Sequence, residues 1–416
     1  MLRRLRVVAL AALLLIAAFS TGAIFLFFLV YLGALVIGGS YVLTRIGLAD
    51  LEAGYVLDRL HAHAGDALRA TYTVRNTSRL PKPWLEAHNP TTLPVPIPGR
   101  ALSLRPRGER SWSARVPLTR RGHYRVDPLV LRTGDPFGLF ESSATVGSHS
   151  NVIVYPRVEE LPAWRLPPAA IEGTHAHPVR TPHTTPHATS IRPYAPGDAY
   201  NRIHWKSSAR HIELQVKEFD LEQTADVWIY LDLDAAVHTG TGDESTLEYG
   251  VRAAASIAAQ ALLDGRALGM TASGARRLVL PADRGPRQYQ KVMHLLAAVE
   301  ADGSQPIRDV LIDGVSRLRR GMTALAITPS LERDWIRPLV TLRGRGVTTL
   351  VVLPDAPAFA RLAPDSVEAA EAQRGARAVY HALAEHDVLA YPVRPGKPLA
   401  VQLASSMQPR LQVIAR

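Results

Sequence analysis

The chain has 416 residues, enough for two or three domains, and a hydrophobic fraction of 47% that is ordinary for a folded protein. It contains no cysteine, which excludes disulfides, thiolate metal sites and cysteine nucleophiles. A formal net charge of +11 suits an anionic membrane surface or an acidic partner. Because the arginines are scattered rather than gathered in one stripe, we expect no nucleic-acid partner.

The N-terminal region is strongly apolar, and residues 7–43 carry no charged side chain. As one helix this run would be about 55 Å long, nearly twice the thickness of a bilayer's hydrocarbon core, about 30 Å. Ser20, Thr21 and Gly22 form a small polar break near its middle. Residues 1–46 are therefore predicted to form a transmembrane hairpin of two helices.

Positive charges flank this region and predict its orientation. Arg3, Arg4 and Arg6 precede the first helix, Arg45 follows the second, and the turn between the helices has none. By the positive-inside rule both ends are cytoplasmic, which predicts a cell-membrane protein with two spans and a cytoplasmic soluble region. The alternative is a cleaved signal peptide that ends near Ser20 and leaves one span after it.

Residues 47–160 change to alternating patterns, as in Leu68 to Val74 and Ser111 to Val116, broken by proline and glycine clusters. This pattern predicts an all-β, immunoglobulin-like sandwich. The run D-P-F-G-L-F begins at Asp135 and is expected to form a turn, with Phe137 among the side chains that pack inside.

Residues 161–225 combine a linker with the densest motif of the chain. Four histidines of the linker, from His175 to His187, stand among prolines, so a loop is expected there rather than a metal site. The motif follows as P-G-D-A-Y-N-R-I-H-W-K-S-S-A-R, from Pro196 to Arg210. Asp198 is expected to cap a helix whose Ile203 and Trp205 face the core.

Two interpretations of this motif stay open. The favoured one is an interdomain or partner-binding lock formed by Gly197, Asp198, Arg202, His204, Trp205, Lys206, Ser208 and Arg210. The alternative is a catalytic cluster, with His204 or Asp198 as a base and Ser207 or Ser208 as a nucleophile. No third partner for such a pair can be recognised in the sequence, which favours the lock.

The motif P-G-D-x-x-x-R-I-H-W-K-x-S-A-R resembles the signature of the domain of unknown function 58 family. The R-R-G-H-Y run at Arg120, the D-P-F-G-L-F run at Asp135 and V-Y-P-R at Val154 are also similar to that family's amino-terminal half. The resemblance implies a von Willebrand factor A-like region after the motif. It also implies company with MoxR-type AAA+ ATPases and transglutaminase-like membrane proteins. Pro193 departs from the acidic residue expected at its position.

Residues 226–416 alternate short apolar strands with helices, which predicts an α/β, doubly wound and mainly parallel sheet. Such folds place ligands at the carboxyl ends of strands, and Asp232 ends the first one. The von Willebrand factor A resemblance implies a Mg²⁺ site of the form D-x-S-x-S there. Here Asp234 and Ala236 replace the serines, so Asp232 and Asp234 are expected to form a degenerate site that holds Mg²⁺ at most weakly.

These patterns together predict a non-enzymatic, membrane-anchored scaffold or adaptor. Its expected partners are the membrane, a MoxR-type AAA+ ATPase and a transglutaminase-like membrane protein, in envelope-related assembly. The alternatives are a hydrolase that uses the cluster from Asp198 to Arg210 and a metal-dependent adhesion module.

Overall fold

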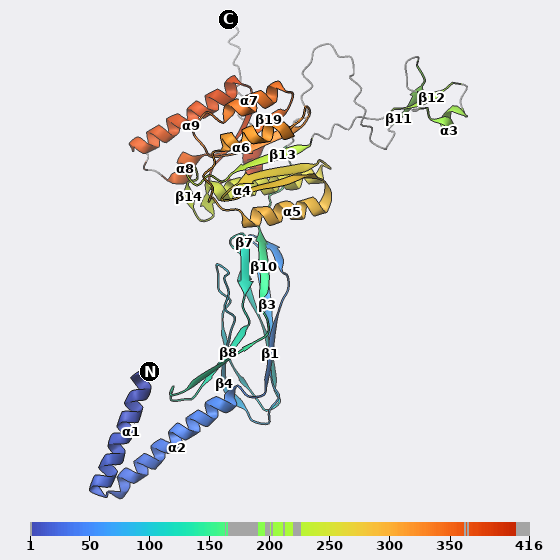
Figure 1. Ribbon diagram of the computed structural model, residues 1–416. Coiled ribbons are helices and arrows are strands. Elements are labelled where there is room, and N and C mark those ends of the chain that lie inside the picture. Colours follow the sequence, from blue (N-terminus) through green and yellow to red (C-terminus); the bar gives the residue numbers. More distant parts are fainter. Residues whose placement is uncertain are drawn as a thin grey trace. The chain divides into compact units, whose positions relative to one another are not determined.

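The computed structural model describes residues 2–162, 164, 190–195, 200, 203–210, 213–218, 226–361, 363 and 366–404. The chain divides into two compact units, residues 1–157 with 293–298 and residues 158–292 with 299–416. Figure 1 shows their elements, coloured along the sequence. Gly197, Asp198, Arg202 and the histidine-rich tract lie outside the described residues.

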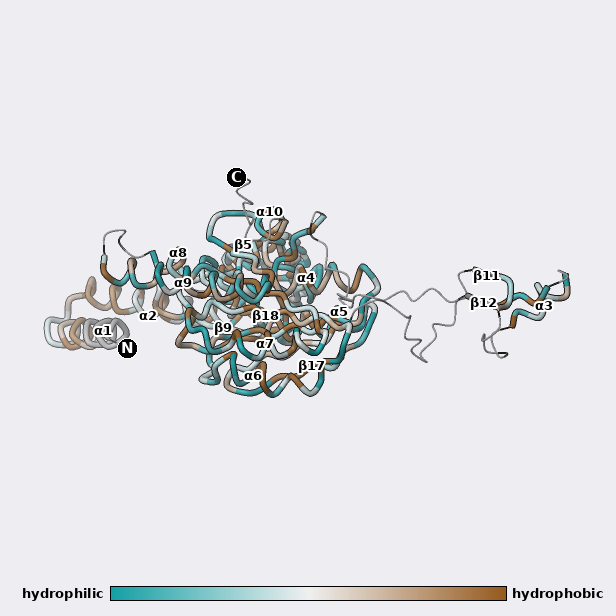
Figure 2. Tube along the Cα trace, turned by 90° about the horizontal axis from the view of Figure 1, so that it is seen from above, coloured by the Kyte–Doolittle hydropathy of each residue, from teal (hydrophilic) through white to brown (hydrophobic). Residues whose placement is uncertain are grey.

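The first unit begins with two helices, α1 (Leu2–Thr21) and α2 (Ile24–Gly47). Gly22 separates them with a φ of +64°, a left-handed conformation that glycine adopts without strain. Phe19 and Phe27 contact each other edge to face across this turn, with ring centroids 5.3 Å apart. Among the described helices, α2 is long and apolar enough to cross a membrane, and Figure 2 shows its apolar residues in brown. A second span and a cytoplasmic soluble region stay predictions.

The rest of the first unit consists of β-strands in three sheets. One sheet has the order β1-β3-β6, a second has β5-β4-β8-β9 and a third has β2-β10-β7. Their bounds are β1 (Leu51–Leu57), β2 (His61–His63), β3 (Ala67–Asn76), β4 (Lys82–His88), β5 (Arg100–Leu104), β6 (Glu109–Pro117), β7 (Gly122–Val126), β8 (Leu129–Gly134), β9 (Glu141–Val146) and β10 (Ser150–Tyr155).

Alternation along the strands builds the core of this region. In β3, Leu68, Ala70, Tyr72 and Val74 are buried while the residues between them face solvent. They belong to one apolar cluster with side chains from the other sheets, such as Leu131 of β8. This arrangement is consistent with the predicted β-sandwich.

The second unit contains a six-stranded sheet of order β17-β16-β13-β18-β19-β20. All neighbouring strands run parallel except the edge strand β17, which is antiparallel to β16. The bounds are β13 (Val227–Asp232), β16 (Leu268–Ser273), β17 (Arg277–Asp283), β18 (Thr323–Ile327), β19 (Thr348–Pro354) and β20 (Leu389–Val393). The predicted α/β class and the mainly parallel sheet are confirmed. The von Willebrand factor A assignment stays a prediction.

Unbroken apolar runs explain why these strands form the interior, since strands of a parallel sheet are covered on both faces. Every residue of β13, β16 and β18 is buried, whereas the edge strand β17 is mostly exposed. The helices are α4 (Thr246–Leu263), α5 (Gly285–Ala298), α6 (Ile307–Gly314), α7 (Ile336–Gly344), α8 (Ala356–Ala360), α9 (Val367–Glu385) and α10 (Leu399–Leu403). A two-stranded ribbon, β14 (Gly240–Thr241) and β15 (Glu244–Ser245), precedes α4.

The sequence motif lies in a separate small element of the chain. Strands β11 (Ser190–Pro193) and β12 (Gln215–Glu218) pair antiparallel, and the one-turn helix α3 (Trp205–Ser208) lies between them in sequence. Ile203 is buried and forms an isolated antiparallel bridge with Val216 of β12.

Candidate functional site

The order of the six-stranded sheet reverses between β13 and β18, the place where open α/β sheets bind ligands. Asp232 ends β13, and Thr328 directly follows β18. The Thr328 hydroxyl donates a 2.6 Å hydrogen bond to Oδ2 of Asp232, and the backbone N–H of Asp234 donates to Oδ1 at 3.0 Å. Asp232 is 2% exposed, and this burial raises the pKa of its carboxyl group to about 6.

A histidine lies against the main chain of the same aspartate. His238 Nε2 is 3.0 Å from the Asp232 carbonyl oxygen, and Nδ1 is 3.0 Å from the Thr246 hydroxyl. Burial lowers the pKa of His238 below its ordinary value, so the neutral ring donates from Nε2 to the carbonyl. Nδ1 then accepts from Thr246, which itself accepts from the backbone N–H of Thr239 at 2.9 Å. His238 therefore holds the loop after β13 in place.

Asp234 is committed to the loop as well. Its Oδ1 accepts a 3.0 Å hydrogen bond from the backbone N–H of Ala236, while Gly303 bonds to the backbone on both sides of Asp234. A side chain at position 303 would collide with the carbonyl oxygens of Ser273 and Leu233. The loop thus depends on the close approach of a glycine backbone.

The oxygens at this strand end do not fit a Mg²⁺ site of the D-x-S-x-S form. Such an ion requires near-octahedral oxygen ligands, and Ala236 offers no side-chain oxygen at the third position. Among the described residues, no three His, Asp or Glu side chains gather in a way that could hold a metal ion. Weak Mg²⁺ binding by Asp232 and Asp234 stays a prediction, and no chemical step is derived from it.

The motif residues that the structure describes form a capped turn. His204 is the N-cap of α3, and its Nδ1 accepts from the backbone N–H of Ser207 at 3.2 Å. The Ser208 hydroxyl donates to the His204 carbonyl at 3.1 Å and accepts from the backbone N–H of Gln215 at 2.8 Å. The turn is therefore tied to β12, and the cap is His204 rather than the Asp198 expected from the sequence.

The outer face of this turn is aromatic and basic. Trp205 is 66% exposed, and Lys206 and Arg210 are exposed beside it. The prediction that Trp205 faces the core is wrong, because a single helical turn leaves only Ile203 in position to be buried. Exposure of this tryptophan suits the partner-binding interpretation of the motif better than the interdomain lock.

A serine and a histidine of the motif are in contact, as the catalytic alternative requires. Ser207 Oγ lies 2.7 Å from His204 Nδ1. The same nitrogen also accepts the capping hydrogen bond, and among the described residues no acidic side chain bonds to the ring. Nucleophilic catalysis needs a base that a further group orients, so this pair is explained by the cap.

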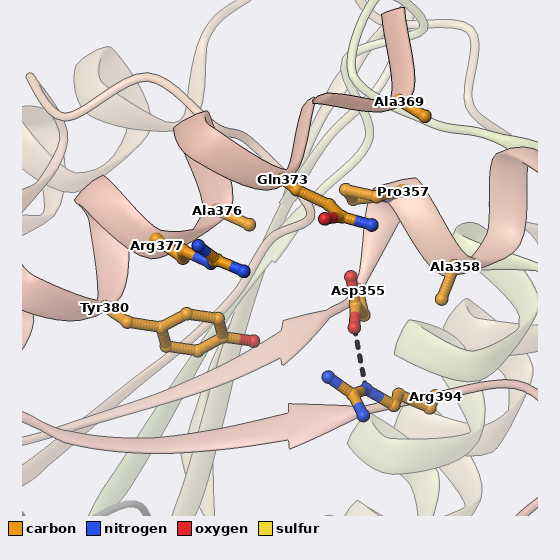
Figure 3. A pocket seen from close by; sticks show the side chains of 9 residues that line it. All are labelled: Asp355, Pro357, Ala358, Ala369, Gln373, Ala376, Arg377, Tyr380 and Arg394. Atoms are coloured by element: carbon orange, nitrogen blue, oxygen red, sulfur yellow. Dashed lines mark hydrogen bonds and ion pairs between the residues drawn. The ribbon is translucent and has the colours of Figure 1, made fainter. Parts of the chain in front are cut away.

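A cavity that the sequence had not indicated opens beyond the ends of β19 and β20 (Figure 3). Its volume is about 500 Å³, and Asp355 and Arg394, the residues that follow the two strands, pair across it at 2.8 Å. Arg377 and Tyr380 of α9 also line it. With two guanidinium groups and one carboxylate, the lining disfavours a cation. An aspartate after a buried strand is the sequence signal that marks this place.

The chain is similar to proteins of one family. The family described as "Protein of unknown function DUF58" matches residues 190–362, a stretch that includes both the motif and the end of β13. The uncharacterized protein YeaD of Bacillus subtilis is 26% identical over 314 residues, which cover 73% of this chain and 76% of YeaD. The resemblance found in the motif is thus confirmed for residues 190–362.

More distant matches cover less. Uncharacterized proteins of Mycobacterium bovis and Mycobacterium tuberculosis are 28% identical over 195 residues, and the match spans 61% of their length. Among solved structures, the CARDB domain of a Pyrococcus furiosus protein matches 25% of this chain at 15% identity, over 92% of its own length, with a TM-score of 0.19. A PapD-like domain of human CEP192 matches 27% of the chain and 89% of that domain at 10% identity, with a TM-score of 0.18. Neither structural likeness is close enough to support a function.

Proposed function

We propose that this protein is a membrane-anchored scaffold that binds partner proteins through the exposed face of α3. The first partner is a MoxR-type AAA+ ATPase and the second a transglutaminase-like membrane protein, in envelope-related assembly. Membrane attachment is supported by α2, and these two partners are implied by the family resemblance. The observation that carries the proposal is the exposed side chain of Trp205 on a hydrogen-bonded turn.

Exposed tryptophans anchor protein interfaces, because a large rigid side chain buries much apolar area with little loss of conformational freedom. Trp205 lies on a turn whose backbone is already ordered by its cap and by Ser208, so binding requires little further ordering. Lys206 and Arg210 add two positive charges to the same turn. A complementary partner surface is therefore acidic and contains an apolar pocket.

The α/β unit supports a von Willebrand factor A-like scaffold in the same proposal. Its central strand ends in Asp232, at the point where such domains place their binding site, and an antiparallel strand lies at one edge of the parallel sheet. The carboxylate of Asp232 accepts two internal hydrogen bonds, which suits a structural role. The hydrolase and metal-dependent adhesion alternatives receive no specific support from the contacts of the described residues.

The test is direct binding of the purified MoxR-type ATPase from the same genome to the tagged, detergent-solubilised full chain. We compare the wild type with Trp205→Ala and with a matched control, Val401→Ala, whose side chain is 65% exposed on α10. Loss of a central aromatic anchor should weaken binding at least about tenfold, while the control binds like the wild type.

Binding that is equal for all three chains would show that α3 is not the docking surface. If the ATPase does not bind the wild type at all, the proposed partner is wrong. Circular dichroism spectra that match the wild type confirm that both variants are folded.

A further inference from the structure

The C-terminal end of α2 is fixed to the β-sandwich within the first unit (Figure 1). Ser40, Thr44 and Gly47 are the buried residues of the helix, and any side chain at position 47 would collide with Thr133 of β8. The buried Lys82 of β4 donates from Nζ to the Ile46 carbonyl at 2.5 Å, so it satisfies an acceptor at the helix C-terminus. The helix therefore ends in firm contact with β4 and β8.

The length of α2 places this junction at the edge of a bilayer. Its 24 residues extend over about 36 Å, and a hydrocarbon core of about 30 Å accommodates the first 20 or so, to about Leu43. Tyr41 lies in the last turn of that span, and its ring contacts Phe140 edge to face at a centroid distance of 5.8 Å. Phe140 ends the β8–β9 turn, so this turn lies level with the end of the hydrocarbon core.

The β8–β9 turn presents an apolar side chain to solvent. Asp135 accepts hydrogen bonds from the backbone N–H groups of Phe137 at 2.9 Å and Phe140 at 2.6 Å, and Gly138 has a φ of +65°. This tight geometry leaves Phe137 58% exposed, so the prediction that it packs inside is wrong. Trp84 of β4, which adjoins Gly134 at the base of the turn, is 46% exposed.

Loops at the same end of the sandwich carry positive charge. The loop before β4 bonds to Asp50, just after α2, and to the loop after β5, so these segments form one surface. Four exposed arginines lie on it or on the adjoining end of α2, against two exposed acids, which leaves a surplus of two positive charges. The arginines are Arg45, Arg79, Arg105 and Arg107, and the acids are Asp50 and Glu141.

We infer that this end of the sandwich rests on an anionic bilayer surface. Phe137 and Trp84 enter the interfacial layer, where aromatic side chains are enriched, and the arginines lie near the lipid phosphates. The partner is a lipid surface because the face continues directly from a helix that is apolar enough to cross the membrane. The inference rests on the membrane attachment in the proposed function.

The absence of cysteine from the chain allows a clean test with single-cysteine variants that carry an environment-sensitive fluorophore. Phe137→Cys reports on the β8–β9 turn. Leu35→Cys reports on the exposed side of α2, and Leu60→Cys, 48% exposed beyond the other end of β1, is the matched control on the sandwich. Each labelled full-length chain is reconstituted into vesicles of phosphatidylcholine with phosphatidylglycerol, with nitroxide quenchers at shallow or deep positions on the lipids.

The label at position 35 should be quenched by the deep nitroxide, the label at 137 by the shallow one, and the label at 60 by neither. If position 35 is quenched while 137 behaves like 60, the inference is wrong and membrane attachment stands. If position 35 is not quenched, membrane attachment fails and the inference fails with it. A blue-shifted but unquenched label at 137 would reveal a protein contact, such as a second copy, and would also overturn the inference.

The contribution of the arginines is measured separately with vesicles of phosphatidylcholine alone. Shallow quenching at position 137 should fall when the anionic lipid is omitted, because the positive surface then loses its counterpart. Equal quenching in both kinds of vesicle would refute the role assigned to the arginines.

Discussion

Replacing Asp232 by asparagine tests the electrostatic account of the end of β13. The amide has nearly the shape of the carboxylate and can keep both of its contacts. Its oxygen accepts from the N–H of Asp234, and its NH₂ group donates to the Thr328 hydroxyl. The substitution therefore removes a buried charge while leaving the packing in place.

The raised pKa of Asp232 sets the expected magnitude. In the unfolded chain the carboxyl group loses its proton near pH 3.8, whereas in the folded state it keeps the proton to about pH 6. Between these values the folded state binds more protons, so stability falls as pH rises through this window. The shift of about 2 units corresponds to about 3 kcal/mol at neutral pH. After about 1 kcal/mol for the weaker hydrogen bonds of the amide, Asp232→Asn should be about 2 kcal/mol more stable than the wild type.

The assay is urea unfolding of the detergent-solubilised full chain at a series of pH values from about 4 to about 8. The quantity compared is the difference in unfolding free energy between variant and wild type. This difference cancels His238, whose lowered pKa makes both chains less stable as pH falls through its folded and unfolded values.

The expected difference changes sign with pH. Near pH 4 the wild type is equal or slightly more stable, and above pH 6 the variant is more stable. A difference that does not change with pH would refute the raised pKa. A wild type that gains relative stability as pH rises would mean that a positive charge or a bound cation lowers the pKa of Asp232.

Three further outcomes follow from the same contacts. Thr328→Val should lower the unfolding free energy by about 1.5–3 kcal/mol, because it removes a hydrogen bond to a buried carboxyl group. Thr349→Val, at a buried hydroxyl that makes no hydrogen bond, should change it by less than about 1 kcal/mol in the same urea titration. Gly314→Ala should destabilise the chain by more than about 2 kcal/mol in thermal unfolding, since the added methyl group collides with buried Tyr230, whereas Gly344→Ala meets open space and should be tolerated. Millimolar Mg²⁺ should leave the melting temperature of the wild type unchanged, and a concentration-dependent increase would reveal a cation site.

Strongly patterned segments were predictable from the sequence. The strand Val227–Asp232 matches its prediction to the residue, because an unbroken apolar run between polar segments has few alternatives to a buried strand. The predicted break at Ser20 to Gly22 coincides with the end of α1. The edge strand β17 was not predicted, because its exposed residues lack a burial pattern.

Large apolar side chains in turns could not be placed from the sequence. Phe137 and Trp205 were both expected to pack inside, since burial is favourable for such side chains. Each is exposed because local hydrogen bonds set the backbone of its turn, from Asp135 in one case and His204 in the other. Hydropathy says nothing about the direction in which such a turn presents a side chain.

The sequence by itself determined the apolar N-terminal helix, the change from alternating to continuous apolar strands, and the position of Asp232 at a strand end. Only the tertiary structure decided what that aspartate contacts. Thr328 is 96 residues away, and it reaches Asp232 because β18 lies beside β13 in the sheet. Strand order depends on how helices and strands pack together across the whole unit, and no local pattern of residues contains that information.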